Sequence, residues 1–425
     1  MQMNKQETEF PSKTTQILVF LFALIALIVD GTDVMMLSYS LVSLKAEFGL
    51  SSFQAGTFAS FTLIGMLIGG VIGGWTCDRY GRVRTIAVSI ALFSIGTFLL
   101  GHAQNYWQFG IIRLFASMPL GAVYLACNIL VSEYFSNKYR STIMSTMLSG
   151  YILGFILAAF LSGLIIPEHG WRWLFYIALA PIILVLFIQK FIPEPAAWRN
   201  LQKARQSGIS ANPITNLQNP QHQSGLKQIF KNPESRLMFI CWSLISFFLL
   251  YGYYGVNVWM PSYLEKDLGM NFKSMTNYMI ASYAATVFGK ISAGIMADKL
   301  GRRIVFSLGC LCTAGFLLVL INYNTPHNIF MLLIMFGFVY GFSTGIHTTY
   351  LTESFSTANR GLAAGVSYNI GRIGGAIAPP TIGLIATHTS FTIGFLVICL
   401  AYAVTALIPA IFVKDRMYDP QQSTS

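Results

Sequence analysis

Long apolar runs recur along the whole chain of 425 residues, and they limit the folds that it can adopt. A helix needs about 20 apolar residues to cross the roughly 30 Å hydrocarbon core of a membrane, and runs of this kind occur twelve times. Only 10% of the residues are charged, against about 25% in soluble domains, and the mean hydropathy is +0.59. No single soluble core can bury so much apolar surface. The sequence therefore predicts an all-α membrane protein and excludes a soluble fold.

The apolar runs form two sets of six, separated by a polar stretch. Predicted transmembrane helices cover residues 17–43, 54–77, 84–102, 107–132, 141–166, 171–192, 237–263, 275–297, 303–322, 327–352, 361–387 and 389–413. The predicted organisation is a tail at residues 1–16, a six-helix bundle at 17–192, a linker at 193–236, a second six-helix bundle at 237–413 and a tail at 414–425. Because the linker is rich in Gln, Asn, Ser and Pro, we expect it to have little regular structure.

The basic residues predict the orientation of the chain in the membrane. Of the 27 Lys and Arg residues, 20 fall in the tails, the linker and the loops of one side, 4 in the loops of the other side and 3 within the apolar runs. Cytoplasmic loops are enriched in Lys and Arg, so both termini are predicted to be cytoplasmic. This topology accounts for the net charge of +11. We therefore expect the lipid bilayer, and no nucleic acid, as a partner.

Metal, cofactor and enzyme chemistry find no support in the residue pattern. The six cysteines lack a zinc-binding spacing, and the six histidines are scattered singly, so no metal site is predicted. No nucleophile is paired with a base, so we predict neither enzyme activity nor a cofactor. Lys290 follows Gly289 without the rest of a phosphate-binding loop. It lies near the cytoplasmic end of its run, toward which we expect its amine to extend.

A displacement of 220 positions relates the two halves of the chain. Residues 74–82 (GWTCDRYGR) recur as residues 294–302 (GIMADKLGR), and residues 132–140 match residues 352–360 at Glu, Phe, Ser and Arg positions. Several matches at one displacement indicate two bundles of the same topology, related by an axis along the membrane normal. A substrate is then expected to bind between the bundles, near the middle of the membrane.

The repeated motif is predicted to form a charged latch on the cytoplasmic face. Its members are Gly74, Asp78, Arg79, Gly81, Arg82, Glu133 and Arg140 in the first half, and Asp298, Gly301, Arg302, Glu353 and Arg360 in the second. The glycines permit a tight turn, and the acids can bond helix ends or arginines, so the contacts can form and break. Such a latch would stabilise one access state of a two-bundle carrier. The alternative is a static loop whose basic residues only reflect the enrichment of Lys and Arg on the cytoplasmic side.

The repeated loop and the twelve spans resemble the major facilitator superfamily, and this resemblance covers essentially the whole chain. Within it, the Asp-Gly-Thr-Asp sequence at residues 30–33 and the Arg113 and Glu133 positions resemble the aromatic acid:proton symporter family, which includes benzoate, hydroxybenzoate and cis,cis-muconate carriers. The resemblance implies uptake of a carboxylate together with protons, across the bacterial inner membrane. It also implies functional roles for Asp30, Asp33, Arg113 and Glu133.

Asp30 and Asp33 are the two acids placed deep within an apolar run. Spaced three residues apart, they share one helical face, about 20 to 25 Å from the cytoplasmic start of the helix. Two neighbouring carboxylates repel in a low-dielectric medium, so at least one of them is expected to carry a proton at neutral pH. We predict a proton-coupling pair. The alternative is a structural pair that caps a break at Gly31 or bonds to neighbouring helices.

Two arginines within apolar runs are candidates for binding a carboxylate. Arg113 lies about 9 Å from the periplasmic end of its run, at a depth comparable to that of Asp33, so the two can pair. Either Arg113 is released to the substrate when Asp33 is protonated, or it forms a permanent contact that links two helices. Arg372 lies about 16 Å deep and has no deep acid in its own half. We expect it to bind a substrate carboxylate, with Asp30 or backbone carbonyls as alternative partners.

Neutral polar residues deep in the runs complete the predicted substrate site. They are Asn128, Tyr253, Asn257, His347, Tyr368 and Asn369. The alternative role for each of these residues is a hydrogen bond that joins two helices. For His347, a further alternative is the relay of protons. The combined prediction is a secondary transporter that imports an organic carboxylate, with the proton as coupling ion, and that functions as a monomer. The competing prediction is a proton-coupled exporter of drugs or metabolites with the same fold.

Overall fold

The structure is a computed structural model that describes residues 12–135, 137–196, 198–200, 202, 226–231, 233–355 and 360–413. Side chains at residues 137–142, 226–228 and 360–361 are outside this description. The side chains of Arg140 and Arg360, both predicted latch members, therefore lie outside the described residues. The same holds for most of the predicted tails and for residues 203–225 of the predicted linker.

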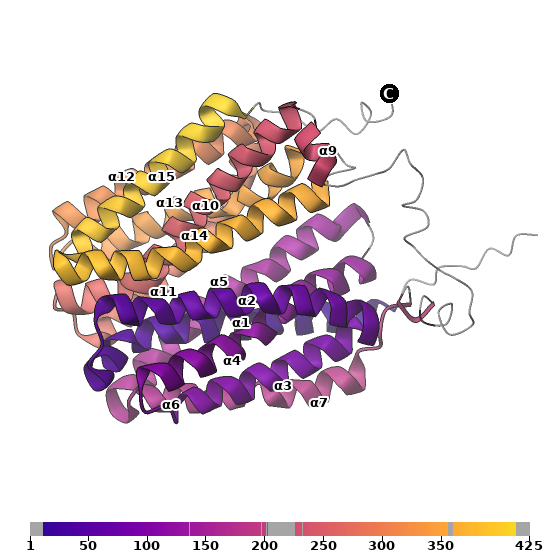
Figure 1. Cartoon of the computed structure of the whole chain (residues 1–425), viewed down its shortest axis with the longest axis horizontal. Helices are drawn as coiled ribbons and strands as arrows, with labels where there is room; N and C mark the ends of the chain where they lie inside the picture. The colour runs from indigo at the N-terminus through magenta and orange to yellow at the C-terminus, as the bar shows by residue number, and fades with distance from the viewer. Residues whose placement is uncertain are drawn as a thin grey trace, which may run out of the picture.

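The first half of the chain folds into a bundle of long helices (Figure 1). They are α1 (Lys13–Phe48), α2 (Ser52–Tyr80), α3 (Arg82–Leu100), α4 (Tyr106–Tyr134) and α5 (Asn137–His169), followed by α6 (Trp171–Tyr176), the 3-10 helix η1 (Ile177–Leu179) and α7 (Ile182–Phe191). The last three elements lie along one apolar segment of 21 residues. This bundle matches the six apolar runs expected before the linker.

The second half repeats this arrangement. It consists of α9 (Leu226–Lys231), α10 (Pro233–Ser262) with its π-helical extension η4 (Tyr263–Asp267), α11 (Phe272–Leu300), α12 (Arg302–Tyr323), α13 (Ile329–Glu353), α14 (Arg360–His388) and α15 (Phe391–Phe412). Eleven segments among the described residues are long and apolar enough to span a membrane. α14, with 29 residues, is not one of them, because Arg372 and two prolines lower its hydropathy.

Glycines allow the long helices to approach closely. α1 runs unbroken through Gly31, so the break that belonged to the alternative for the aspartate pair is absent. A Cβ atom on Gly31 would lie 2.2 Å from the backbone oxygen of Tyr151 in α5. Gly31 therefore serves close packing between α1 and α5 rather than a bend in α1.

The packing of the two bundles repeats at the same displacement as the sequence. In α2, a Cβ on Gly69 would meet the backbone oxygen of Met118 at 1.7 Å, and in α11 a Cβ on Gly289 would meet that of Phe338 at 1.9 Å. These residue pairs are 220 positions apart. The α2–α4 contact is therefore reproduced by the α11–α13 contact.

The bundles meet mainly through α2 with α14 and α5 with α11. We call the end that carries Gly81, Glu194 and Gly301 the linker end, and the other end the far end. Toward the far end, Ser60 Oγ donates to the backbone oxygen of Ala376 at 2.5 Å. The ribbons of α2 and α14 lie together there and diverge toward the linker end (Figure 1). The two bundles are thus closed against each other at the far end.

Candidate transport site

Asp33 is held by an extensive set of contacts inside the first bundle. Arg113 Nη1 lies 2.9 Å from Asp33 Oδ2, and Arg113 Nη2 donates to the backbone oxygen of Asp33 at 3.2 Å. Thr97 Oγ1 donates to Asp33 Oδ1 at 2.6 Å, and Arg113 Nε donates to Thr62 Oγ1 at 2.8 Å. The four side chains come from α1, α2, α3 and α4, and all are buried. The Asp33 charge is therefore neutralised and both of its carboxylate oxygens are satisfied.

Asp30 lies about one turn away on the same helix, in a very different environment. Its side chain is fully buried, and neither carboxyl oxygen has a hydrogen-bond partner among the described residues. The groups close enough to act on it electrostatically include Asp33, Arg113 and Arg372. Burying an ionised carboxylate without donors costs several kcal/mol, whereas the protonated acid is much cheaper to bury. Asp30 is thus suited to take up and release a proton.

Arg372 reaches from the second bundle toward the first. Its Nη1 atom lies 3.6 Å from the position that a Cβ would take on Gly70 in α2. Its guanidinium lies over the ring of Tyr368, 5.7 Å from the ring centroid. No ion pair of Arg372 is present among the described residues. A half-buried cation that has no ion pair among the described residues, at the boundary of the two bundles, is suited to bind an anion.

Tyr253 and Asn257 form a compact polar cluster with Tyr340, which the sequence did not single out. The rings of Tyr253 and Tyr340 are stacked at an interplanar angle of 8°, with centroids 5.9 Å apart. Asn257 Nδ2 donates to Tyr340 Oη at 2.7 Å and to the backbone oxygen of Tyr253 at 2.8 Å. The cluster joins α10 to α13 inside the second bundle.

His347, on α13 of the second bundle, lies among aromatic side chains. Its Nε2 is 3.0 Å from Ser246 Oγ. Its ring neighbours Trp242, Phe306 and Tyr368 at centroid distances of 5.9 to 6.2 Å. Through Tyr368 it is connected to Arg372, and no carboxylate contacts it among the described residues.

The two remaining predicted asparagines bond to their own helices. Asn128 Nδ2 donates to the backbone oxygen of Tyr124 at 2.7 Å, and Asn369 Nδ2 donates to that of Gly365 at 3.0 Å. Asn369 is exposed and Asn128 is half-buried. The structure therefore does not bring them into the Asp33–Arg113 cluster or the Tyr253–Asn257 cluster.

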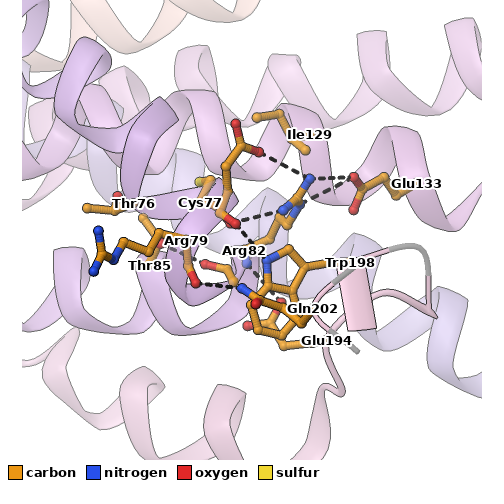
Figure 2. Close-up of polar contacts among 12 residues, drawn as sticks. Thr76, Cys77, Arg79, Arg82, Thr85, Ile129, Glu133, Glu194, Trp198 and Gln202 are labelled. Atoms are coloured by element: carbon orange, nitrogen blue, oxygen red, sulfur yellow. Dashed lines mark hydrogen bonds and ion pairs between the residues drawn. The ribbon is translucent and has the colours of Figure 1, made fainter. Parts of the chain in front are cut away.

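At the linker end, Arg82 joins the helix ends of the first bundle (Figure 2). Its Nη2 lies 2.9 Å from Glu133 Oε1 and 3.5 Å from Asp78 Oδ1, and its Nη1 donates to the backbone oxygen of Cys77 at 2.9 Å. Gly81 has φ +108°, a conformation that favours glycine. Arg79 takes no part in these contacts: its guanidinium lies 5.3 Å from the Trp75 ring centroid. Gly74 approaches Leu125 of α4.

The second bundle repeats the same cluster. Arg302 Nε lies 3.2 Å from Glu353 Oε2, and Arg302 Nη1 pairs with Asp298. Gly301 has φ +90°. Each arginine is thus paired with acids of its own bundle, so each predicted latch holds one bundle together at its linker end.

Glu194 belongs to the first of these clusters, although the sequence did not single it out. Its carboxylate accepts the backbone N–H of Arg82 at 2.8 Å and that of Arg84 at 3.0 Å, and so caps the N-terminus of α3. Two neighbouring linker residues reinforce the contact: Trp198 Nε1 and Gln202 Nε2 donate to the backbone oxygens of Asp78 and Arg79 (Figure 2). The only sequence signal was an acid between two prolines directly after the sixth span.

Two helical bundles of one topology, with charged residues inside their long apolar helices, are typical of secondary membrane transporters. The chain belongs to the Major Facilitator Superfamily, whose sequence profile matches residues 23–292 and 273–425. The predicted fold class and family are therefore confirmed, and the protein is a multi-pass membrane transporter rather than an enzyme.

Named relatives and solved structures agree with this family. The chain is 51% identical over 423 residues to the cis,cis-muconate transport protein of Acinetobacter baylyi, covering 100% of both chains. It is 27% identical to the benzoate transport protein of the same organism, over 95% of this chain and 91% of that protein. The xylose transporter XylE from E. coli, solved in an inward open conformation, has the same fold: the TM-score is 0.78 at 18% identity, covering 96% of this chain and 98% of that one.

Proposed function

We propose that the protein imports an organic carboxylate, of the muconate or aromatic-acid class, by proton symport. The observation that carries this proposal is that a buried acid, Asp30, and a cation at the boundary of the bundles, Arg372, act on each other electrostatically while neither has an ion pair among the described residues. Identity of 51% over the full length to a cis,cis-muconate transport protein supports the substrate class. The sequence alone did not separate the roles of the two aspartates.

The coupling follows from competition for one cation. When Asp30 is protonated, the described residues offer Arg372 no ion pair, and its guanidinium is available to a substrate carboxylate. When Asp30 loses its proton, its negative charge competes with the substrate for Arg372 and favours release. Asp33 is bound by Arg113, and we assign to this pair the positioning of α1 against α4 rather than a part in the coupling.

Access alternates by rocking of the two bundles around this site. The far end is closed through α2 and α14, as described above, and the linker-end clusters of Arg82 and Arg302 keep each bundle rigid while it moves. We place the linker end and both termini in the cytoplasm, because most Lys and Arg residues lie on that side. The membrane is the bacterial inner membrane, and one chain forms the complete pathway.

Proteoliposomes with an imposed pH gradient test the proposal. We expect labelled cis,cis-muconate or benzoate to accumulate in wild-type vesicles only when protons are driven inward. Asp30→Asn, which cannot cycle its proton, should lose accumulation but retain exchange of substrate against substrate. Glu168→Gln, at an exposed acid on α5, is the matched control and should behave as wild type.

A different outcome would favour the exporter prediction. If neither acid enters while preloaded cationic dyes leave in exchange for protons, carboxylate symport is wrong. Loss of both accumulation and exchange in a folded Asp30→Asn variant would instead show that Asp30 does not have the proposed role in coupling.

A further inference from the structure

Lys290, like Arg372, is a cation within a long helix. Among the described residues, no carboxylate forms an ion pair with it. Its backbone is packed tightly against α13. A Cβ on Gly345 would lie 3.0 Å from Lys290 Cα and 3.2 Å from its Cβ, and a Cβ on Gly341 would lie 2.7 Å from its N atom. The start of the side chain is therefore fixed by glycine packing, ten residues before the last residue of α11.

The internal repeat indicates where this side chain points. Gly70 of α2 is the counterpart of Lys290, 220 positions earlier. A Cβ on Gly121 would lie 2.9 Å from the N atom of Gly70, just as a Cβ on Gly341 would lie 2.7 Å from that of Lys290. A Cβ on Gly70 would itself face Arg372 Nη1, across the boundary of the bundles. We infer that the Lys290 side chain leaves α11 toward the same boundary, on the side where α11 meets α5.

The internal repeat also indicates the depth of Arg372 and Lys290 along the membrane normal. Arg372 lies at the level of Gly70, and an axis along the membrane normal carries Gly70 onto the Lys290 position at the same level. The α2–α14 and α5–α11 contacts are the two main seams between the bundles. Arg372 and Lys290 thus flank the space between the bundles from two seams at one depth.

We propose that the transported substrate is a dicarboxylate held at its two ends, with one carboxylate on Arg372 and the other on Lys290. This inference rests on the proposed function and specifies its substrate. It assigns to Lys290 a role different from the one expected from sequence, in which its amine extends to the cytoplasmic surface.

A charge count within the spans favours a dianion. The deep charges are Arg113, Lys290 and Arg372 against Asp30 and Asp33, which leaves one excess positive charge when all are ionised. Protonation of Asp30 raises the excess to two. A bound dicarboxylate then makes the loaded protein neutral at this depth, whereas a monocarboxylate leaves one uncompensated charge in a low-dielectric medium.

Binding of a diacid and its half-ester to the purified protein tests this assignment. By titration calorimetry, we expect wild type to bind cis,cis-muconate about tenfold or more tightly than muconate monomethyl ester, the effect of one charge-assisted contact. Lys290→Gln should weaken diacid binding to the level of the half-ester and leave half-ester binding unchanged. Lys290→Arg should keep the preference, and Lys299→Gln, at an exposed lysine of the same helix, should match wild type.

The possible failures are distinguishable. If a folded Lys290→Gln protein keeps the preference for the diacid, or weakens both ligands equally, the role of Lys290 is wrong while carboxylate transport stands. If wild-type protein binds neither ligand and moves neither muconate nor benzoate, the proposed function itself is wrong. Thermal unfolding of each variant establishes that the compared proteins are folded.

Discussion

Arg113 binds Asp33 through both the side chain and the backbone: Nη1 contacts Oδ2 at 2.9 Å, and Nη2 donates to the carbonyl oxygen at 3.2 Å. A guanidinium bound in this way fixes its own rotamer and the position of α1 against α4. Asp30, three residues earlier, receives no comparable contact from the described residues. The two acids of one short motif thus have different environments, an ion pair for Asp33 and no hydrogen-bond partner among the described residues for Asp30.

Removing one partner of the Asp33–Arg113 pair should destabilise the protein strongly. Arg113→Gln leaves Asp33 buried without its counter-charge, a change worth about 3 to 5 kcal/mol in buried pairs. We expect a clear drop in the midpoint of thermal unfolding in detergent. The double variant Asp33→Asn with Arg113→Gln carries no buried charge there and should recover part of the loss. A single variant as stable as wild type would contradict the structural role of the pair.

The two linker-end clusters should differ in strength, although they share one design. The Arg82 side chain is 8% exposed and the Arg302 side chain is 24% exposed, so solvent screens the second cluster more. Glu133→Gln should therefore lower the unfolding midpoint more than Glu353→Gln does. The repeat makes each variant the control for the other, and equal losses would show that burial does not decide their contribution.

Close packing at Gly31 should make this position intolerant of a methyl group. Ala at residue 31 would place Cβ 2.2 Å from a backbone oxygen of α5, so the helices must separate. Overpacking of this kind costs about 1 to 3 kcal/mol. Gly315→Ala is the matched control, because a Cβ there has no neighbour within 4 Å. Unfolding midpoints measured side by side should fall for Gly31→Ala only, and a fall of equal size for both would refute the packing argument.

Loss of the Glu194 carboxylate should loosen the start of the linker from α3. Glu194→Ala removes the acceptor for the backbone N–H groups of Arg82 and Arg84, at a cost of about 1 kcal/mol for a helix cap. We expect faster tryptic cleavage after Arg199 under native conditions. An unchanged cleavage rate would mean that Trp198 and Gln202 suffice to hold the linker in place.

The sequence predicted the helices well because a span in lipid must satisfy its own backbone hydrogen bonds, which makes apolar run length informative. Helix ends were less predictable: α10 begins at Pro233 rather than at residue 237, since a helix continues into polar residues that do not register as apolar. The packing role of Gly31 was not predictable because the sequence does not show that a neighbouring helix occupies the space of its missing side chain.

The candidate site was predictable in composition but not in pairing. Depth along the helices placed Asp33 and Arg113 at a similar level, and the structure has them in contact. Thr62 and Thr97 gave no signal, because their partners lie 51 and 64 residues away. Glu194 is 112 residues from the backbone that it caps. Contacts of such long range have no local pattern, and for this reason the sequence did not distinguish Asp30 from Asp33.

Joint movement of protons and carboxylate is tested most directly by vesicles that contain a pH-sensitive dye and have no imposed gradient. Addition of cis,cis-muconate outside should acidify the lumen of wild-type proteoliposomes as labelled substrate enters. Asp30→Asn vesicles should show exchange of substrate without acidification. Entry of substrate into wild-type vesicles with no change in lumenal pH, or with alkalinisation, would contradict proton symport.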